Sequence, residues 1–209
     1  MSSQRSTYLI GAGGHAKVIA DILMECGCPP AAFLDDEPPH NRILGITVIK
    51  GLELPEPDSA VIVAVGDNAT RERLARRFFL FDVAIHPSAR VSRDAEIGPG
   101  SVVMAGAVVN AGARIGSHCI VNTSATVDHD CLISDFAHIA PGATLGGNVR
   151  VGRGSMVGLG AHVIHGCAIG EHTIVGAGST VVHDLSSRVV AIGTPARPLR
   201  TRTPDEPYL

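Results

Sequence analysis

A histidine between two acidic residues is the clearest candidate for chemistry in this sequence. His129 lies between Asp128 and Asp130. A carboxylate beside an imidazole raises its basicity and fixes which ring nitrogen carries the proton. Such an imidazole suits a general base, which removes a proton from an attacking hydroxyl or amine. The sequence therefore predicts that His129 is a base tuned by a neighbouring carboxylate.

A glycine-rich turn near the start of the chain could bind a phosphate group. Gly13, Gly14 and His15 follow a short apolar run and precede a helical pattern. Backbone N–H groups at a helix start bind anions, and acids about twenty residues later can hold a ribose. Asp35 and Asp36 occupy that place. The turn lacks the last glycine of a dinucleotide fingerprint, and the two acids could also form a solvated turn.

The elements that position these residues follow a repeat of six. From Ile85 to Val181, every sixth residue is a branched aliphatic, and from Ile97 the residue two places earlier is small or valine. A helix of 3.6 residues per turn would spread both columns around its surface. Short strands that turn every six residues would instead point one large and one small side chain inward.

A second period of 18 residues indicates three such strands in each coil. Small residues recur at this interval, where a stacked corner needs tight turns: Gly98, Gly116, Ser134, Gly152 and Gly170. Successive coils would be separated by the ordinary strand spacing of about 4.8 Å. We therefore expect a solenoid with three faces that begins near Ile85.

Residues 1–84 show a different pattern, in which short apolar runs alternate with helical segments. Strands are expected at 8–10, 33–34 and 60–65, and helices at about 16–27 and 69–79. Strands that alternate with helices favour a small parallel α/β domain. The sequence therefore predicts two units, 1–84 and 85–209.

The composition excludes several classes of protein. A net charge of −3 gives no electrostatic footprint for nucleic acid. No apolar run approaches the roughly 20 residues of a membrane-spanning helix. The first residues lead directly into a strand, so no secretory signal is expected, and five cysteines without disulfide spacing suit a reduced compartment. We expect a cytoplasmic protein without nucleic-acid or membrane partners.

These features together resemble the hexapeptide-repeat sugar O- and N-acetyltransferases. That family includes sialic acid O-acetyltransferases and enzymes that acetylate nucleotide-linked 4-amino-4,6-dideoxy sugars. The segments that carry the resemblance are 13–15, 33–36, 64–68, 122–131, 137–142 and 193–197. The resemblance implies a Rossmann-like α/β domain followed by a left-handed parallel β-helix, assembled as a homotrimer with acetyl-CoA in the clefts between neighbouring helices.

The resemblance also implies an activity and its residues. The expected reaction is acetyl transfer from acetyl-CoA to the C4 amine of a UDP- or GDP-linked amino sugar, for a bacterial surface glycan, without a metal. His129 would be the general base and Asp130 its partner. The implied acetyl-CoA contacts are His138, Gly147, Leu159, Gly160, Ala177 and Gly178. The implied nucleotide-sugar contacts are Gly13, Gly14, His15, Asp35, Asp36 and Gly66.

Further expectations concern histidines, a glycine and a cysteine of the repeat. Eight of the ten histidines lie there, none in an inward column, so exposed positions are expected for all eight. Gly147 lies 18 residues after His129, where the missing side chain would let a thioester approach. Cys131 occupies the small inward column, and a buried cysteine is a poor nucleophile. Direct attack is therefore favoured over an acetyl-cysteine intermediate.

Three other functions remain open at this point. The first is O-acetylation of a sugar such as sialic acid. The second is a γ-type carbonic anhydrase, because His129 and His165 share one column and could bind zinc between subunits. Gly170 stands where that family would place its third ligand, and His172 is displaced by two positions. The third is a non-catalytic sugar-binding scaffold, which the acid-flanked His129 disfavours.

Overall fold

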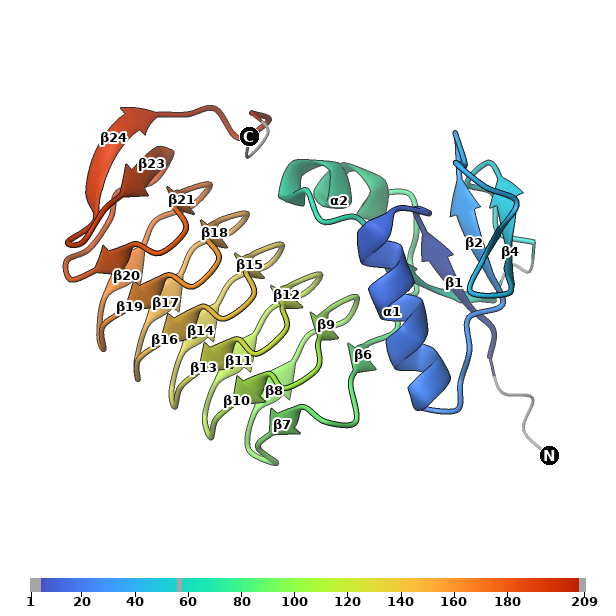
Figure 1. Ribbon diagram of the computed structural model, residues 1–209, viewed down its shortest axis with the longest axis horizontal. Helices are drawn as coiled ribbons and strands as arrows, with labels where there is room; N and C mark the ends of the chain where they lie inside the picture. Colours follow the sequence, from blue (N-terminus) through green and yellow to red (C-terminus); the bar gives the residue numbers. More distant parts are fainter. Residues whose placement is uncertain (1–4, 56–57, 207–209) are drawn as a thin grey trace.

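The computed structural model describes residues 5–55 and 58–206, which form two packed units (Figure 1). The first is a small α/β unit and the second a long solenoid. Helix α1 of the α/β unit lies against the first coils of the solenoid, and helix α2 lies beside the middle coils (Figure 1). The α/β unit therefore covers one face of the solenoid.

The α/β unit contains a five-stranded sheet in the order β3-β4-β2-β1-β5. Its strands are β1 (Thr7–Ile10), β2 (Ala32–Asp35), β3 (Arg42–Ile43), β4 (Ile46–Lys50) and β5 (Ala60–Val63). All neighbours are parallel except the β3–β4 hairpin, which the sequence did not predict. Helices α1 (Gly14–Glu25) and α2 (Asn68–Ala75) follow β1 and β5. Helix α2 is shorter than predicted because the backbone beyond it forms tighter hydrogen bonds, from residue i to residue i−3. This turn buries the Phe78 ring.

The solenoid consists of two-residue strands, each paired in parallel with strands 18 residues away. The first sheet contains β6 (Ala84–Ile85), β9 (Val102–Val103), β12 (Ile120–Val121), β15 (His138–Ile139), β18 (Met156–Val157) and β21 (Ile174–Val175). The second contains β7 (Arg90–Val91), β10 (Val108–Val109), β13 (Thr126–Val127), β16 (Thr144–Leu145), β19 (His162–Val163) and β22 (Thr180–Val181). The third contains β8 (Glu96–Ile97), β11 (Arg114–Ile115), β14 (Leu132–Ile133), β17 (Arg150–Val151) and β20 (Ala168–Ile169). An antiparallel hairpin of β23 (Val189–Ile192) and β24 (Arg197–Thr201) extends the first sheet.

Three lines of turns connect these sheets along the solenoid. We call the turns from the first to the second sheet the first corner, those from the second to the third the second corner, and those returning to the first sheet the third corner. Gly98 and Gly116 stack at the third corner, where a Cβ on Gly98 would lie 2.6 Å from the Gly116 carbonyl carbon. The predicted stack of small residues is therefore confirmed.

The two inward columns form the core of the solenoid. Every repeat residue from Val103 to Val181 is at most 3% exposed, and the small column packs between them. Ile85, Val91 and Ile97 are more exposed because they form the open end of the coil stack. The predicted parallel β-helix is confirmed, and the units 1–84 and 85–209 remain our proposal, with β6 at their junction.

The outer face of the first sheet is also buried, which corrects one expectation. Val102, Met104 and Ile120 point outward and pack against α1. Under the same cover His118 and His138 are only 6% and 8% exposed. The expectation of exposed positions is therefore wrong for both histidines, because the α/β unit covers the face and the corner that carry them.

A membrane-spanning helix does not occur within residues 5–55 and 58–206. Both helices there are too short or too polar to cross a bilayer.

Candidate active site

His129 and Asp130 form a hydrogen-bonded pair at the second corner, between β13 and β14. His129 Nδ1 lies 2.8 Å from Asp130 Oδ2. Asp128 has a different task, because its Oδ1 accepts from the backbone N–H of His129 and from the Asn110 side chain, both at 2.8 Å. Asp128 therefore shapes the turn, and Asp130 orients the imidazole.

The electrostatics of this pair suit a base. The hydrogen bond that His129 donates to Asp130 raises the pKa of His129, and the charge of Asp128 adds to the rise. When Nδ1 donates its proton to Asp130, the basic lone pair lies on Nε2. The His129 side chain is 55% exposed, so the ring is open to a substrate.

Gly147 lies directly above His129 in the next coil. A Cβ added to Gly147 would lie 2.5 Å from both Cε1 and Nε2 of His129. The imidazole itself fills the space that we expected a thioester to use. Gly147 therefore seats the ring of the proposed base, and a contact between its backbone and acetyl-CoA remains a proposal.

A groove lies beside Asp130 along the third sheet. Its volume is about 410 Å³, and Arg114 and Arg150 line it on either side of Leu132. Three carboxylates line the same groove, and Arg114 pairs with Glu96 at 3.8 Å, so the groove carries charges of both signs.

The predicted acetyl-CoA row lies along the first corner. Leu159 and Ala177 are exposed, and Gly160 and Gly178 follow them with φ of +59° and +64°. The position of a Cβ on either glycine is open space. Four of the predicted residues thus form an exposed line one coil apart, on the opposite edge of the second sheet from His129. One chain does not bring this line and His129 together.

His138 lies beside that line but is buried under the α/β unit. Asn122 Nδ2 donates to His138 Nε2 over 3.0 Å. Burial, together with the smaller effects of the charges of Arg71 and His15, lowers the pKa of His138 to about 3. His138 is therefore a neutral imidazole, suited to donating or accepting a hydrogen bond rather than carrying charge.

The predicted phosphate turn opens helix α1. Gly13 is the N-cap residue, and neither Gly13 nor Gly14 has a neighbour within 4 Å of a Cβ position. The helix N-terminus is therefore accessible to an anion. The His15 side chain is half-buried with its Nε2 atom shielded from solvent, and burial together with the charge of Arg71 lowers its pKa to about 4. A contact between His15 and a phosphate remains a proposal.

The two candidate acids after β2 have different surroundings. Asp35 Oδ2 accepts from the backbone N–H of Ala12 at 2.8 Å, and Oδ1 accepts from that of Glu37 at 2.9 Å. Asp35 therefore ties the loop after β1 to the loop after β2, whereas Asp36 is exposed. Gly66 follows β5, which flanks β1 on the opposite side from β2.

Cys131 has the environment of a packing residue. It is fully buried, its Sγ donates to the Gly146 carbonyl over 3.2 Å, and burial raises the pKa of the thiol. A thiol in this state is a poor nucleophile. The part of the chain that the structure describes also contains no group of three or more His, Cys, Asp or Glu side chains placed to hold a metal.

Sequence reasoning missed two residues that the structure places at this site. Asn122 was part of a marked segment, but only the fold shows its bond to His138. Arg71 lies on the polar helix α2, where an arginine normally faces solvent, yet it is only 1% exposed. The position of Asn122 in a first-corner turn could have marked it as a candidate in the sequence. No feature of the sequence marked Arg71.

Comparison with known proteins places both units among sugar acetyltransferases. Residues 7–78 match the family described as the PglD N-terminal domain. A UDP-N-acetylbacillosamine N-acetyltransferase of Bacillus subtilis is 43% identical in an alignment of 119 residues that covers 48% of this chain and 52% of that protein. The chain thus spans about half the length of that curated relative.

Solved structures match nearly the whole chain. The acetyltransferase domain of PglB from Neisseria gonorrhoeae, in complex with acetyl coenzyme A, is 41% identical with a TM-score of 0.88, over 94% of this chain and 100% of that one. A perosamine N-acetyltransferase variant from Caulobacter crescentus, in complex with CoA and GDP-perosamine, is 42% identical with a TM-score of 0.88, over 92% and 96%. WeeI from Acinetobacter baumannii is 25% identical with a TM-score of 0.84, over 94% and 100%.

Proposed function

Because the chain belongs to the hexapeptide-repeat sugar acetyltransferase family, we propose that it transfers an acetyl group from acetyl-CoA to the C4 amine of a nucleotide-linked 4-amino-4,6-dideoxy sugar. The observation that carries the proposal is the exposed His129–Asp130 pair on a solenoid corner. The names of two relatives, which include UDP-N-acetylbacillosamine and perosamine, support an amine as the nucleophile.

The proposed reaction is a direct attack. The neutral amine bonds to the thioester carbonyl carbon while His129 Nε2 accepts a proton from the nitrogen. The carbon–sulfur bond then breaks, and the coenzyme leaves as a thiol after taking up the proton. Asp130 stabilises the imidazolium that forms in between, consistent with the raised pKa of His129. The burial of Cys131 argues against an acetyl-cysteine intermediate.

The proposed base and the proposed acetyl-CoA line lie at different corners of the solenoid, which supports an assembly of several copies. His129 lies at the second corner, and the Leu159–Gly160 line lies at the first, on opposite edges of the second sheet. Copies whose second sheets face a common axis would place His129 of one beside the first corner of the next. We therefore propose a cyclic homotrimer with acetyl-CoA in each cleft. Light scattering should give three times the chain mass, and a monomer under active conditions would contradict it.

We propose that the nucleotide lies on the α/β unit. The open N-terminus of α1 at Gly13 and Gly14 suits its phosphates, and exposed Asp36 suits its ribose. Binding of free UDP and GDP, measured by calorimetry, should decide which base the pocket accepts. Failure of both to bind would contradict this placement.

A substrate panel tests the proposed activity. The panel contains UDP- and GDP-linked 4-amino-4,6-dideoxy sugars and free sialic acid, with release of coenzyme thiol as the measurement. We expect turnover only with an amino sugar. His129→Ala should lower kcat by about 10²- to 10⁴-fold and retain coenzyme binding.

His183→Ala is the matched control, because His183 is an exposed histidine of the same corner, three coils beyond His129. It should keep wild-type turnover. Acetylation of sialic acid alone would contradict the proposed substrate, and full activity of His129→Ala would contradict the proposed base.

A further inference from the structure

Arg71 is a fully buried cation at the boundary between the two units. Its side chain is 1% exposed, among the largest fully buried side chains of the described residues. Each of its five N–H donors has an acceptor at 2.6–2.9 Å, namely the carbonyls of Val65, Gly66, His118 and Phe136 and the Oδ1 of Asn68. Its planar guanidinium therefore joins the loop after β5 to the solenoid.

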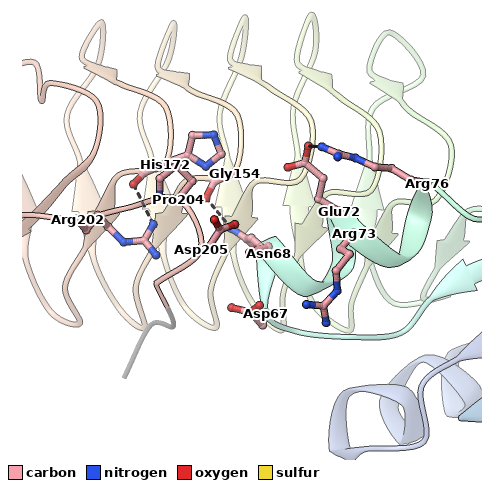
Figure 2. Close-up of a pocket in the computed structure, with 11 residues that line it drawn as sticks. Asp67, Asn68, Glu72, Arg73, Arg76, Gly154, His172, Arg202, Pro204 and Asp205 are labelled. Atoms are coloured by element: carbon pink, nitrogen blue, oxygen red, sulfur yellow. Dashed lines mark hydrogen bonds and ion pairs between the residues drawn. The ribbon is translucent and has the colours of Figure 1, made fainter. Parts of the chain in front are cut away.

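The solenoid acceptors form a regular line. His118, Phe136 and Gly154 lie 18 residues apart at the third corner, with φ of 56°, 60° and 64°. Arg71 binds the carbonyls of the first two, and Asn68 Nδ2 donates to Gly154 O at 3.0 Å, as Figure 2 shows, and to Ser155 O at 3.1 Å. We call these two side chains the Arg71–Asn68 clasp. The clasp spans three successive coils and so fixes the height of α2 along the solenoid.

The clasp also connects the two proposed ligand sites. Gly66, whose carbonyl accepts from Arg71, lies in the loop of residues 64–67 after β5, which we call the nucleotide-sugar loop because Gly66 is a proposed nucleotide-sugar contact. Phe136, whose carbonyl accepts from the same guanidinium, lies two residues before His138. The charge of Arg71 contributes to the lowered pKa of both His15 and His138, which belong to opposite units.

We propose that Arg71 is a positioning residue for acetyl transfer, which holds the nucleotide-sugar loop at the height of the solenoid coils that carry the reaction. This inference rests on the proposed function. The clasp touches neither the thioester nor His129, so its effect is on geometry. A misplacement of about 1 Å at a reacting centre can cost about 10²-fold in rate.

Arg71→Lys tests this role. Lysine keeps the charge but has three donors on one nitrogen, which cannot reach five acceptors in a plane. We expect kcat to fall by about 10- to 10²-fold, while the Kd values of coenzyme A and of the free nucleoside diphosphate stay within about twofold. A purely structural residue would not produce this split between rate and binding.

Asn68→Asp is a second variant, for the case that Arg71→Lys does not fold. It keeps the Oδ1 acceptor for Arg71 and removes the donors to Gly154 and Ser155. It should also lower kcat and leave the Kd values of coenzyme A and of the free nucleoside diphosphate unchanged.

Glu72→Gln is the matched control. Glu72 also ties α2 to the solenoid, through an ion pair with Arg153 at 2.9 Å, but it makes no bond to the loop of Gly66. Its loss should lower Tm and leave kcat near wild type. A kcat loss equal to that of Arg71→Lys would overturn the inference.

Hydrogen exchange separates this inference from the proposed function. Amide hydrogens of α2 should exchange at least about tenfold faster in Arg71→Lys, whether or not a sugar substrate is turned over. The proposed function is tested separately, by whether the wild-type protein turns over any amino sugar of the substrate panel. Unchanged exchange, a wild-type kcat, or a parallel loss of ligand binding and rate would each overturn the positioning role.

Discussion

Gly147→Ala is the most direct test of how the solenoid holds its base. The added Cβ would lie 2.5 Å from Cε1 and Nε2 of His129. Ordinary contact between such atoms is about 3.5–4.0 Å, so the imidazole must move by about 1 Å or more. A shift of that size at a reacting centre corresponds to a loss of about 10²-fold in kcat. Stability should change little, because the exposed ring can swing into solvent.

The assay is steady-state release of coenzyme thiol with the best amino sugar of the panel, combined with a double-mutant cycle. If the alanine acts by displacing the imidazole, Gly147→Ala should cost nothing further in a His129→Ala background. Circular dichroism and Tm of all three variants establish that the solenoid is intact.

Two results would refute this reasoning. Gly147→Ala with wild-type kcat would show that the ring does not need its present place. An equal additional loss in the His129→Ala background would show that Gly147 acts independently of the base, as an acetyl-CoA contact would.

Three further predictions concern charge. The Asp130 hydrogen bond raises the pKa of His129, so Asp130→Asn should lower that pKa and move the acidic limb of the kcat/KM profile to lower pH; an unmoved limb would contradict the pairing. Asp36→Ala should raise the KM of the nucleotide sugar and leave that of acetyl-CoA unchanged, whereas equal losses would indicate a structural role. The pKa values of His118 and His138 are lowered to about 4 and about 3, so the unfolded chain binds more protons below about pH 6.5. Tm should therefore fall between pH 6.5 and 4, and a flat profile there would contradict their burial.

The periodic part of the fold was predictable because each coil repeats the same local rule. An inward aliphatic every sixth residue fixes the position of every strand from β6 to β22, and the 18-residue period fixes their pairing. The closing hairpin of β23 and β24 follows neither period, so the sequence did not predict it. The His129–Asp130 pair was predictable for a related reason, because adjacent residues at a turn are already neighbours in space.

The remaining features depend on contacts between units, which periodicity does not encode. His118 and His138 occupy outward positions, and only the docked α/β unit makes those positions buried. Arg71 lies on a helix whose polar composition is typical of a solvated face, yet the third corner offers it carbonyls. The sequence predicted a glycine directly above His129. It did not predict that the imidazole fills the space that this glycine leaves open.

The solenoid geometry gives the clasp a consequence for the whole assembly. Asn122, His129 and Phe136 lie at the first, second and third corners of one coil, so all three lie within one coil rise of about 4.8 Å along the solenoid axis. Arg71 binds the Phe136 carbonyl and thereby sets the nucleotide-sugar loop near that height. In a cyclic trimer whose axis runs along the solenoid, symmetry places the same coil of every copy at the same height. The clasp then holds the loop of one copy within about one coil, 4.8 Å, of the height of His129 in the next, and a further displacement of that size would separate amine from base.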